Sequence, residues 1–340
     1  MGKYETHAQQ AVRVIGTGSC LPDEVWTNAR LIEELAKRGI ESSEEWISTH
    51  TGIQERRIAS PAESTSTLGT QAAQHALNNA EIKAEALDLI VCATSTPDMY
   101  LPSTACLIQG ALGAHNAVAF DVNAACTGFV FALATAVNYL RTGPYRTALV
   151  IGADTYSRIL DWNDRTTCVF FGDGAGAVVL QVADDAPGVL GMYLGADGGK
   201  ANCIHAAACG SIPSQPTDSG ERSLATKFSM KGRDVFQFAV AALPDAIRRL
   251  MQQLDMSMDN IDLVISHQAN INIIRHGLSA AGIPQRKAFT NLDRYGNTSA
   301  ASIPIAFDEA LRLKRAIAGN IVILVGFGGG LTWGSALIRM

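Results

Sequence analysis

The sequence lacks an apolar run of about 18 residues, the length that an α-helix needs to cross a bilayer. Its polar first residues, 1–6, have no apolar core of the signal-peptide type. It also lacks an excess of positive charge, because 27 Lys and Arg stand against 32 Asp and Glu for a net charge of −5. Such a chain is poorly suited to gripping nucleic-acid phosphates. We therefore expect a cytoplasmic protein with no membrane span that does not bind nucleic acid.

Motifs for disulfides, metals and nucleotides are missing as well. The seven cysteines are an odd number with no CxxC pair, and no two histidines have zinc-ligand spacing. We expect reduced thiols and no metal site. The glycine-rich runs 172–176 and 326–330 match neither GxxxxGK[ST] nor a GxGxxG between a strand and a helix, which argues against nucleotide hydrolysis.

The sequence does contain a regular alternation of apolar strand-like runs and amphipathic helical stretches. This alternation is typical of α/β folds. It also repeats internally, since 87–96 (LDLIVCATST) aligns with 261–270 (IDLVISHQAN). Further along, 120–127 matches 291–298 as a strand, a turn of small or polar residues and a helix. The chain of 340 residues, 47% of them apolar, is long enough for two such units.

Duplication into halves of 1–185 and 186–340 has a consequence for function. Ligands in α/β folds collect outside the carboxyl ends of strands. Cys126, His267 and Asn297 all lie at predicted strand ends, one in the first half and two in the second. A pseudo-twofold arrangement of the halves would bring the three side chains to one pocket.

Each of these residues also has an ordinary structural interpretation. Cys126 lies where a turn becomes a helix, a position that favours the thiolate and makes it accessible near neutral pH. Most free cysteines, however, only fill small apolar spaces. His267 could be merely hydrogen-bonded, and Asn297 could simply cap a helix. Their matched positions in a duplicated chain favour a shared catalytic role, and the exposed N–H groups of 326–330 could hold an oxyanion.

Six motifs span nearly the whole chain: 46–56 (WISTHTGIQER), 123–128 (NAACTG), 171–176 (FGDGAG), 267–270 (HQAN), 296–304 (GNTSAASIP) and 327–335 (FGGGLTWGS). In this order they resemble the β-ketoacyl-acyl-carrier-protein synthase III enzymes of the thiolase superfamily. The resemblance implies a duplicated, thiolase-like α/β fold of five α-β-α-β-α layers with mixed sheets, assembled as a homodimer.

The resemblance further implies a catalytic triad of Cys126, His267 and Asn297. Acyl-CoA would acylate Cys126, while the backbone N–H groups of Cys126 and Gly329 hold the oxyanion. A malonyl thioester, on acyl carrier protein or coenzyme A, would then lose carbon dioxide as His267 and Asn297 donate hydrogen bonds to its thioester oxygen. The resulting carbanion would attack the acyl-cysteine to give a 3-ketoacyl product. Such an acyltransferase of fatty acid biosynthesis needs no metal and no cofactor beyond its coenzyme A thioester substrate.

Three residues outside the triad also receive roles from the resemblance. Trp46 would stack on the adenine of coenzyme A, Arg165 would contact its nucleotide end, and Leu101 would reach the acyl pocket near the dimer interface. On spacing alone, packing of its helix explains Trp46 equally well. Ser42 and Glu45 form a candidate capping box at the start of that helix.

Four positions lack the positive charge that the family usually has there: His50, Gln54, Gln237 and Asn272. An acidic carrier protein is attracted by positive charge, so these differences predict slower encounter and weaker docking. Three nearby cations could compensate, namely Lys231, Arg233 and Arg275.

Three alternatives to the condensing enzyme stay open. A synthase III-like acyltransferase of specialised metabolism would pass the acyl group to another acceptor. A cysteine hydrolase has a similar Cys, His, Asn order, with His267 141 residues after Cys126 and Asn297 beyond it, although the papain signature CGSCW is absent. The third alternative is a catalytically silent binding protein, in which Cys126 would resist iodoacetamide.

Overall fold

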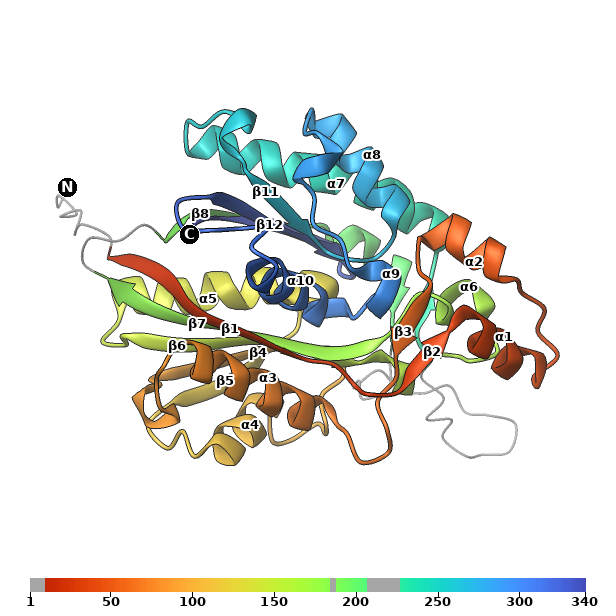
Figure 1. The fold of residues 1–340 in the computed structure, drawn as a ribbon, viewed down its shortest axis with the longest axis horizontal. Helices are drawn as coiled ribbons and strands as arrows, with labels where there is room; N and C mark the ends of the chain where they lie inside the picture. Colours follow the sequence, from red (N-terminus) through yellow and green to blue (C-terminus); the bar gives the residue numbers. More distant parts are fainter. Residues whose placement is uncertain (1–9, 184–187, 207–226) are drawn as a thin grey trace.

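The computed structural model describes residues 10–183, 188–206 and 227–340 (Figure 1). Its strands are β1 (Ala11–Cys20), β2 (Val25–Thr27), β3 (Glu55–Arg57), β4 (Leu89–Ala93), β5 (Val118–Val122), β6 (Thr147–Thr155), β7 (Asp173–Ala183), β8 (Val189–Ala196), β9 (Ile204–His205), β10 (Ser229–Met230), β11 (Leu263–Ser266), β12 (Ile321–Gly328) and β13 (Thr332–Arg339). Its α-helices are α1 (Asn28–Ala36), α2 (Glu44–Thr51), α3 (Thr65–Asn79), α4 (Thr104–Leu112), α5 (Gly128–Thr142), α6 (Arg165–Cys168), α7 (Gly232–Gln253), α8 (Ile271–Ala281), α9 (Leu292–Tyr295) and α10 (Ser302–Arg312). Short 3₁₀ turns, η2 (Ala125–Thr127) and η7 (Ser299–Ala301), directly precede α5 and α10.

Four strands of the first, five-stranded mixed sheet have counterparts in the same order in the second, four-stranded mixed sheet. The first is β1-β7-β6-β4-β5 and the second is β8-β13-β12-β11. In the first, β4 and β6 are parallel and β6 and β7 antiparallel; in the second, β11 and β12 are parallel and β12 and β13 antiparallel. We propose that each half of the chain is the unit built around one sheet. The predicted boundary between 185 and 186 lies outside the described residues.

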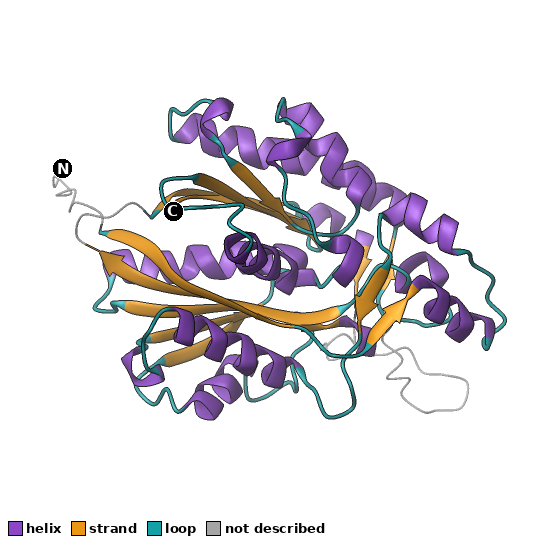
Figure 2. Cartoon of the chain, viewed as in Figure 1, coloured by secondary structure: helices purple, strands orange, loops and turns teal. Residues whose placement is uncertain are grey.

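The elements form five layers (Figures 1 and 2). Helices α3 and α4 cover the outer face of the first sheet, α5 and α10 lie between the two sheets, and α7 and α8 cover the outer face of the second sheet. This arrangement confirms the predicted α/β fold of five α-β-α-β-α layers with mixed sheets. Within the described ranges, every helix is too short or too polar to cross a membrane.

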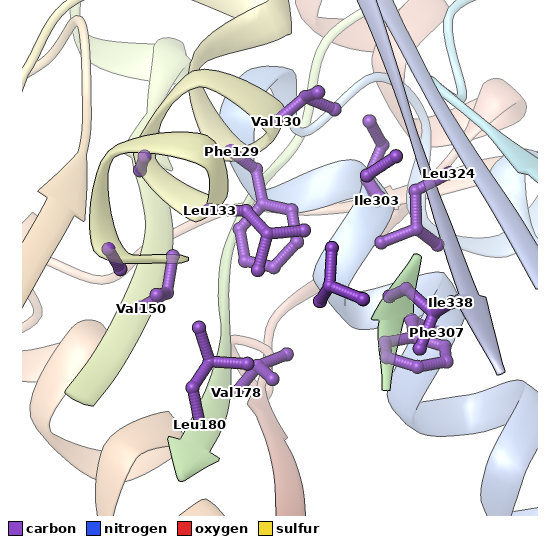
Figure 3. Close-up of a cluster of buried hydrophobic side chains, with 14 of the residues drawn as sticks. Phe129, Val130, Leu133, Val150, Val178, Leu180, Ile303, Phe307, Leu324 and Ile338 are labelled. Atoms are coloured by element: carbon purple, nitrogen blue, oxygen red, sulfur yellow. The ribbon is translucent and has the colours of Figure 1, made fainter. Parts of the chain in front are cut away.

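The middle layer contains the main apolar core (Figure 3). Phe129 and Leu133 of α5 and Ile303 and Phe307 of α10 are almost completely buried between the two sheets. Burial of each such side chain stabilises the fold by roughly 1.5–3 kcal/mol. Both central helices, and therefore the turns that precede them, are held firmly in place.

Equivalent contacts recur 174 positions apart in the two halves. The Asp88 N–H donates to the Thr147 carbonyl at 3.0 Å, and the Asp262 N–H donates to the Ile321 carbonyl at 2.9 Å. The two carboxylates accept hydrogen bonds from the N–H groups of the same partners, Thr147 and Ile321. The internal repeat therefore extends to individual hydrogen bonds.

The turns before α5 and α10 repeat at the same spacing. Asn123 Oδ1 accepts from the Ala125 N–H at 3.3 Å, and Asn297 Oδ1 accepts from the Ser299 N–H at 2.8 Å. Ala125 and Ser299 both have left-handed backbone conformations, with φ of 45° and 51°. Residues other than glycine rarely adopt this region, and in each half it turns the chain sharply into the following helix.

The register of the repeat differs from the one read in the sequence. The predicted match of 120–127 with 291–298 pairs Cys126 with Asn297. In the folded chain Asn123 is the equivalent of Asn297, so the predicted match is displaced by three residues. The reason is that the two turns share a backbone conformation and one asparagine, while their other side chains differ.

Candidate active site

Cys126 lies in the middle of η2, between the end of β5 and the start of α5. Its side chain is buried, and the thiol donates to Ser299 Oγ with an Sγ–Oγ distance of 3.6 Å. The end of β12 lies against it, because a Cβ built on Gly328 would be 2.7 Å from the Cys126 Cβ and 3.3 Å from its Sγ. A cysteine of the first half is thus enclosed by two segments of the second.

Burial dominates the acidity of this thiol. Desolvation disfavours the thiolate and raises the pKa of Cys126 to about 12; the hydrogen bond with Ser299 opposes this rise, and the charge of Asp154 adds to it. The start of a helix led us to expect a Cys126 thiolate near neutral pH. Burial makes that expectation wrong for the enzyme without substrate. The thiol proton has to be taken up by another group when the sulfur reacts.

His267 follows β11, where its N–H donates to the Val325 carbonyl at 2.8 Å. The imidazole ring of His267 packs edge-to-face with the ring of Phe327, and the ring centroids are 5.3 Å apart. His267 Nδ1 is 2.7 Å from Ser302 Oγ. Burial lowers the pKa of His267 to about 3, because the protein interior solvates the cation poorly. The ring is consequently a neutral imidazole at neutral pH.

Asn297 lies between α9 and η7, in a parallel bridge with Phe171. Its N–H donates to the Phe170 carbonyl at 2.8 Å, and its carbonyl accepts from the Gly172 N–H at 3.0 Å. Its side-chain Oδ1 accepts from the Ser299 N–H. This hydrogen bond fixes the orientation of the amide, because its oxygen has to face the Ser299 N–H. The NH₂ group therefore points away from Ser299 and can donate to a ligand.

One cavity of about 680 Å³ brings the predicted triad together. Cys126, His267, Asn297 and Gly329 all line it. Most of its remaining wall is apolar, with eight Trp, Tyr and Phe side chains: Trp46, Tyr156, Phe170, Phe171, Phe228, Phe236, Phe238 and Phe327. An apolar cavity with a few convergent polar groups is the usual form of a site for a small apolar substrate.

Trp46 lines the same cavity, whereas Arg165 and Leu101 are not among its lining residues. Trp46 belongs to α2, at the end of the molecule where α1, α2 and α6 lie together (Figure 1). The cap of α2 is Ser43, whose Oγ accepts from the Trp46 N–H at 3.1 Å. The predicted cap at Ser42 is therefore one residue too early.

Arg165, the first residue of α6, lies directly beside Trp46. Its guanidinium is 4.7 Å from the centroid of the Trp46 ring, and its Nη1 donates to the Glu41 carbonyl at 2.6 Å. His50 stacks on the same ring with centroids 4.7 Å apart. Leu101 lies in the loop before α4 and is 78% exposed. Within one chain, Leu101 is on the surface and outside the cavity.

Two serines beside Asn297 had no role in the sequence interpretation. Ser299 contacts the sulfur of Cys126, and Ser302 contacts Nδ1 of His267. The segment GNTSAAS thus supplies one triad residue and a hydroxyl partner for each of the other two. Its unusual density of hydroxyl and amide side chains at a helix start is the signal that could have indicated these contacts.

Comparisons with known proteins now identify the family. The sequence model described as 3-oxoacyl-[acyl-carrier-protein] synthase III matches residues 120–198, and the model of its C-terminal domain matches residues 251–340. A curated β-ketoacyl-[acyl-carrier-protein] synthase III of Caldanaerobacter subterraneus is 46% identical over 329 residues, which cover 97% of this chain and 98% of that protein. This chain belongs to the β-ketoacyl-acyl-carrier-protein synthase III family. The synthase III of Clostridium acetobutylicum is 46% identical over the same share of this chain and 98% of its own.

Solved structures of the synthase III family agree. The synthase III of Aquifex aeolicus has a TM-score of 0.88 and 41% identity, covering 97% of this chain and 100% of its own. The priming β-ketosynthase of the R1128 polyketide pathway has a TM-score of 0.89 and 31% identity, covering 99% of both chains. These similarities confirm the thiolase-like fold, and membership of the family confirms the predicted class of enzyme, an acyltransferase of the condensing type.

The geometry also distinguishes this synthase III family member from a papain-like hydrolase. In a nucleophile–base arrangement of that kind, a third group orients the base. Here Asn297 Oδ1 accepts from the Ser299 N–H and makes no hydrogen bond to the His267 ring, whose Nδ1 partner is the hydroxyl of Ser302. Membership of the family favours a condensing acyltransferase over the hydrolase alternative and over a silent binding protein.

Proposed function

We propose that this chain is a β-ketoacyl-acyl-carrier-protein synthase III that acylates Cys126 from acyl-CoA and condenses the acyl group with a malonyl thioester. The observation that carries the proposal is that Cys126, His267, Asn297 and Gly329 line the same apolar cavity. The cavity thus combines a nucleophile with hydrogen-bond donors for two oxygens that become negatively charged, one in acylation and one in decarboxylation. We also propose that the reaction needs no cofactor besides its thioester substrates and takes place in the cytoplasm.

In the first step the sulfur of Cys126 attacks the carbonyl carbon of acyl-CoA. A carbon–sulfur bond to Cys126 forms, the bond to the coenzyme A sulfur breaks, and coenzyme A leaves as a thiol with the proton that Cys126 lost. The N–H groups of Cys126 and Gly329 would hold the oxyanion, each worth about 2.7–4 kcal/mol. The close approach of Gly328 to Cys126 supports this assignment, since it brings the end of β12 beside the sulfur.

In the second step a malonyl thioester replaces coenzyme A. Its carboxylate leaves as carbon dioxide, and negative charge develops on the thioester oxygen. The neutral imidazole of His267 and the NH₂ group of Asn297 would donate hydrogen bonds to that oxygen. The carbanion then attacks the acyl carbon, the bond from that carbon to the Cys126 sulfur breaks, and the sulfur takes up a proton that comes from water. The product is a 3-ketoacyl thioester.

The entrance of the cavity has groups that suit coenzyme A and a carrier protein. We assign the adenine to Trp46 and the nucleotide phosphates to Arg165, because an indole stacks on a base and a guanidinium binds phosphate bidentately. The guanidinium and the ring already face each other at 4.7 Å. Lys231, Arg233 and Arg275 are exposed, Arg233 lines the cavity, and we assign to all three the docking of an acidic acyl carrier protein.

A second copy of the chain would explain the exposed edge of the first sheet. Strand β5 is the edge strand, and Val118 on it is 45% exposed. Tyr100 and Leu101, in the neighbouring loop, are 73% and 78% exposed. Unpaired strand edges and exposed apolar side chains are features of interfaces. The proposed role of Leu101 in an acyl pocket depends on this homodimer, because only there could Leu101 reach a cavity.

The test is to incubate the protein with a panel of acyl-CoAs and then with malonyl-acyl carrier protein or malonyl-CoA. Acylation of Cys126, release of carbon dioxide and a 3-ketoacyl product are expected. Acylation without carbon dioxide would instead support the acyltransferase of specialised metabolism. A comparison of the two malonyl carriers identifies the acceptor, and sedimentation velocity determines the assembly.

A further inference from the structure

His267 faces two opposite demands in the proposed reaction. Cys126 is a buried thiol, so its proton needs an acceptor when the sulfur attacks acyl-CoA. The decarboxylation step, in contrast, needs an N–H donor directed at the thioester oxygen. A neutral imidazole carries one ring proton, and each nitrogen is an acceptor or a donor depending on the tautomer. One fixed tautomer of His267 cannot satisfy both steps through the same nitrogen.

The partner of Nδ1 determines which tautomer a histidine has. For His267 that partner is the hydroxyl of Ser302, at 2.7 Å, in the first turn of α10. Ser302 is buried, and the Gln268 N–H also approaches its Oγ, at 3.4 Å. Across the described part of the chain, this hydroxyl is the side-chain group within hydrogen-bonding distance of the His267 ring.

A hydroxyl differs from the other common partners of a catalytic histidine. A carboxylate or a backbone carbonyl only accepts, and it therefore holds the proton on Nδ1. A hydroxyl accepts from Nδ1–H in one tautomer and donates to the bare Nδ1 in the other. Both tautomers of His267 are consequently hydrogen-bonded at Nδ1, without movement of the ring.

We propose that Ser302 is a positioning residue that allows His267 to change tautomer between the two half-reactions. In the free enzyme the proton is on Nδ1, and Nε2 accepts the proton of Cys126. In the acyl-enzyme the proton is on Nε2, which donates to the thioester oxygen of the malonyl substrate. This inference rests on the proposed function.

The protons balance across the cycle. During acylation Nε2 takes the Cys126 proton and returns it to the departing coenzyme A sulfur, so the ring regains its first tautomer. Water that enters when coenzyme A leaves then gives one proton to Nε2, and the ring loses the proton on Nδ1 to water. At the end of the condensation the Cys126 sulfur takes the proton of Nε2, and Nδ1 takes one proton from water. The ring thereby returns to its first tautomer, and each turnover consumes one proton from water.

The decisive measurement is ¹⁵N NMR of the histidine rings in the full-length protein, before and after acylation by an acyl-CoA. The signals of His267 are those that disappear in His267→Gln. We expect Nε2 to be unprotonated in the free enzyme and protonated in the acyl-enzyme, with the reverse at Nδ1. The same tautomer in both states would overturn the proposal. Both states are compared in the wild-type chain, and the His267→Gln variant serves only to assign the signals.

Half-reaction rates provide a second, independent test. Ser302→Ala removes the Nδ1 partner and should slow both acylation by acyl-CoA and decarboxylation of malonyl-CoA by about five- to tenfold, the effect of one neutral hydrogen bond. Ser299→Ala, the matched control in the same segment, should slow acylation alone, since its hydroxyl contacts Cys126. Decarboxylation is measured in the Cys126→Ala background, so that acylation cannot limit it.

Unchanged rates in Ser302→Ala would overturn the inference. A wild-type protein that performs neither half-reaction would instead refute the proposed function.

Discussion

Gly328 marks the point where the end of β12 meets the nucleophile, and Gly328→Ala tests how close that approach must be. The new Cβ would lie 2.7 Å from the Cys126 Cβ and 3.3 Å from its N and Sγ. Ordinary contact begins at 3.4 Å, so the turn and the strand have to move apart. A displacement of about 1 Å between reacting groups can cost about 10²-fold in rate. We therefore expect acylation to slow by about 10- to 100-fold, or roughly 1.4–2.7 kcal/mol of activation free energy.

The assay is intact-mass spectrometry of the protein at successive times after mixing with acyl-CoA. Overpacking of this kind also costs about 1–3 kcal/mol of folding stability, so the Tm is measured alongside. Gly198→Ala is the matched control, because its new Cβ would meet no atom within 4 Å. If Gly328→Ala acylated at the wild-type rate with the wild-type Tm, the close approach of β12 to Cys126 would have no importance for the reaction.

Four further outcomes are expected. Asn297→Asp keeps the Oδ1 that accepts from Ser299 but loses the amide donor, so acylation should persist while carbon dioxide release from malonyl-CoA falls about 10²- to 10³-fold. Trp46→Ala should raise the KM for acyl-CoA up to about tenfold and leave decarboxylation of malonyl-acyl carrier protein, which has no adenine, unchanged. Because burial raises the pKa of Cys126 to about 12, alkylation of the free enzyme by iodoacetamide should accelerate steadily above pH 7, and a rate already constant there would contradict this. Because burial lowers the pKa of His267 to about 3 from 6.5, the unfolded chain binds one proton more between these values. The free energy of unfolding in urea should therefore decrease as the pH falls, with a contribution of up to about 1.4 kcal/mol per pH unit that is absent in His267→Gln.

Sequence reasoning located Cys126, His267 and Asn297 because polar side chains at the ends of apolar strands stand out in a linear pattern. The cavity that all three line agrees with that expectation. The α/β class followed from the alternation of strands and helices, and the five layers followed from the resemblance to the family. These features depend on periodicity and residue type, which the sequence states directly.

Other features depend on contacts that a linear pattern does not contain. The pKa of Cys126 is set mainly by desolvation. The position of Cys126 at a helix start does not reveal how deeply its thiol is buried, and a thiolate was therefore wrongly expected. The contact between Ser302 and His267 joins residues 35 positions apart through the packing of α10 against β11. The register of the repeat was misjudged because the left-handed turns at Ala125 and Ser299 have no side-chain identity in common.

The repeated turn also has a consequence for stoichiometry. The counterpart of Cys126 in the second half is Ala300, whose N–H donates to Asp154 at 3.0 Å. A side chain at Gly152 would come within 2.3 Å of the Ala300 carbonyl, so this second copy of the turn is packed tightly against β6. Although the scaffold occurs twice in the chain, one copy presents a reactive sulfur and the other serves as a structural contact. Each polypeptide should accordingly carry a single acyl group at saturation, and a dimer should carry two.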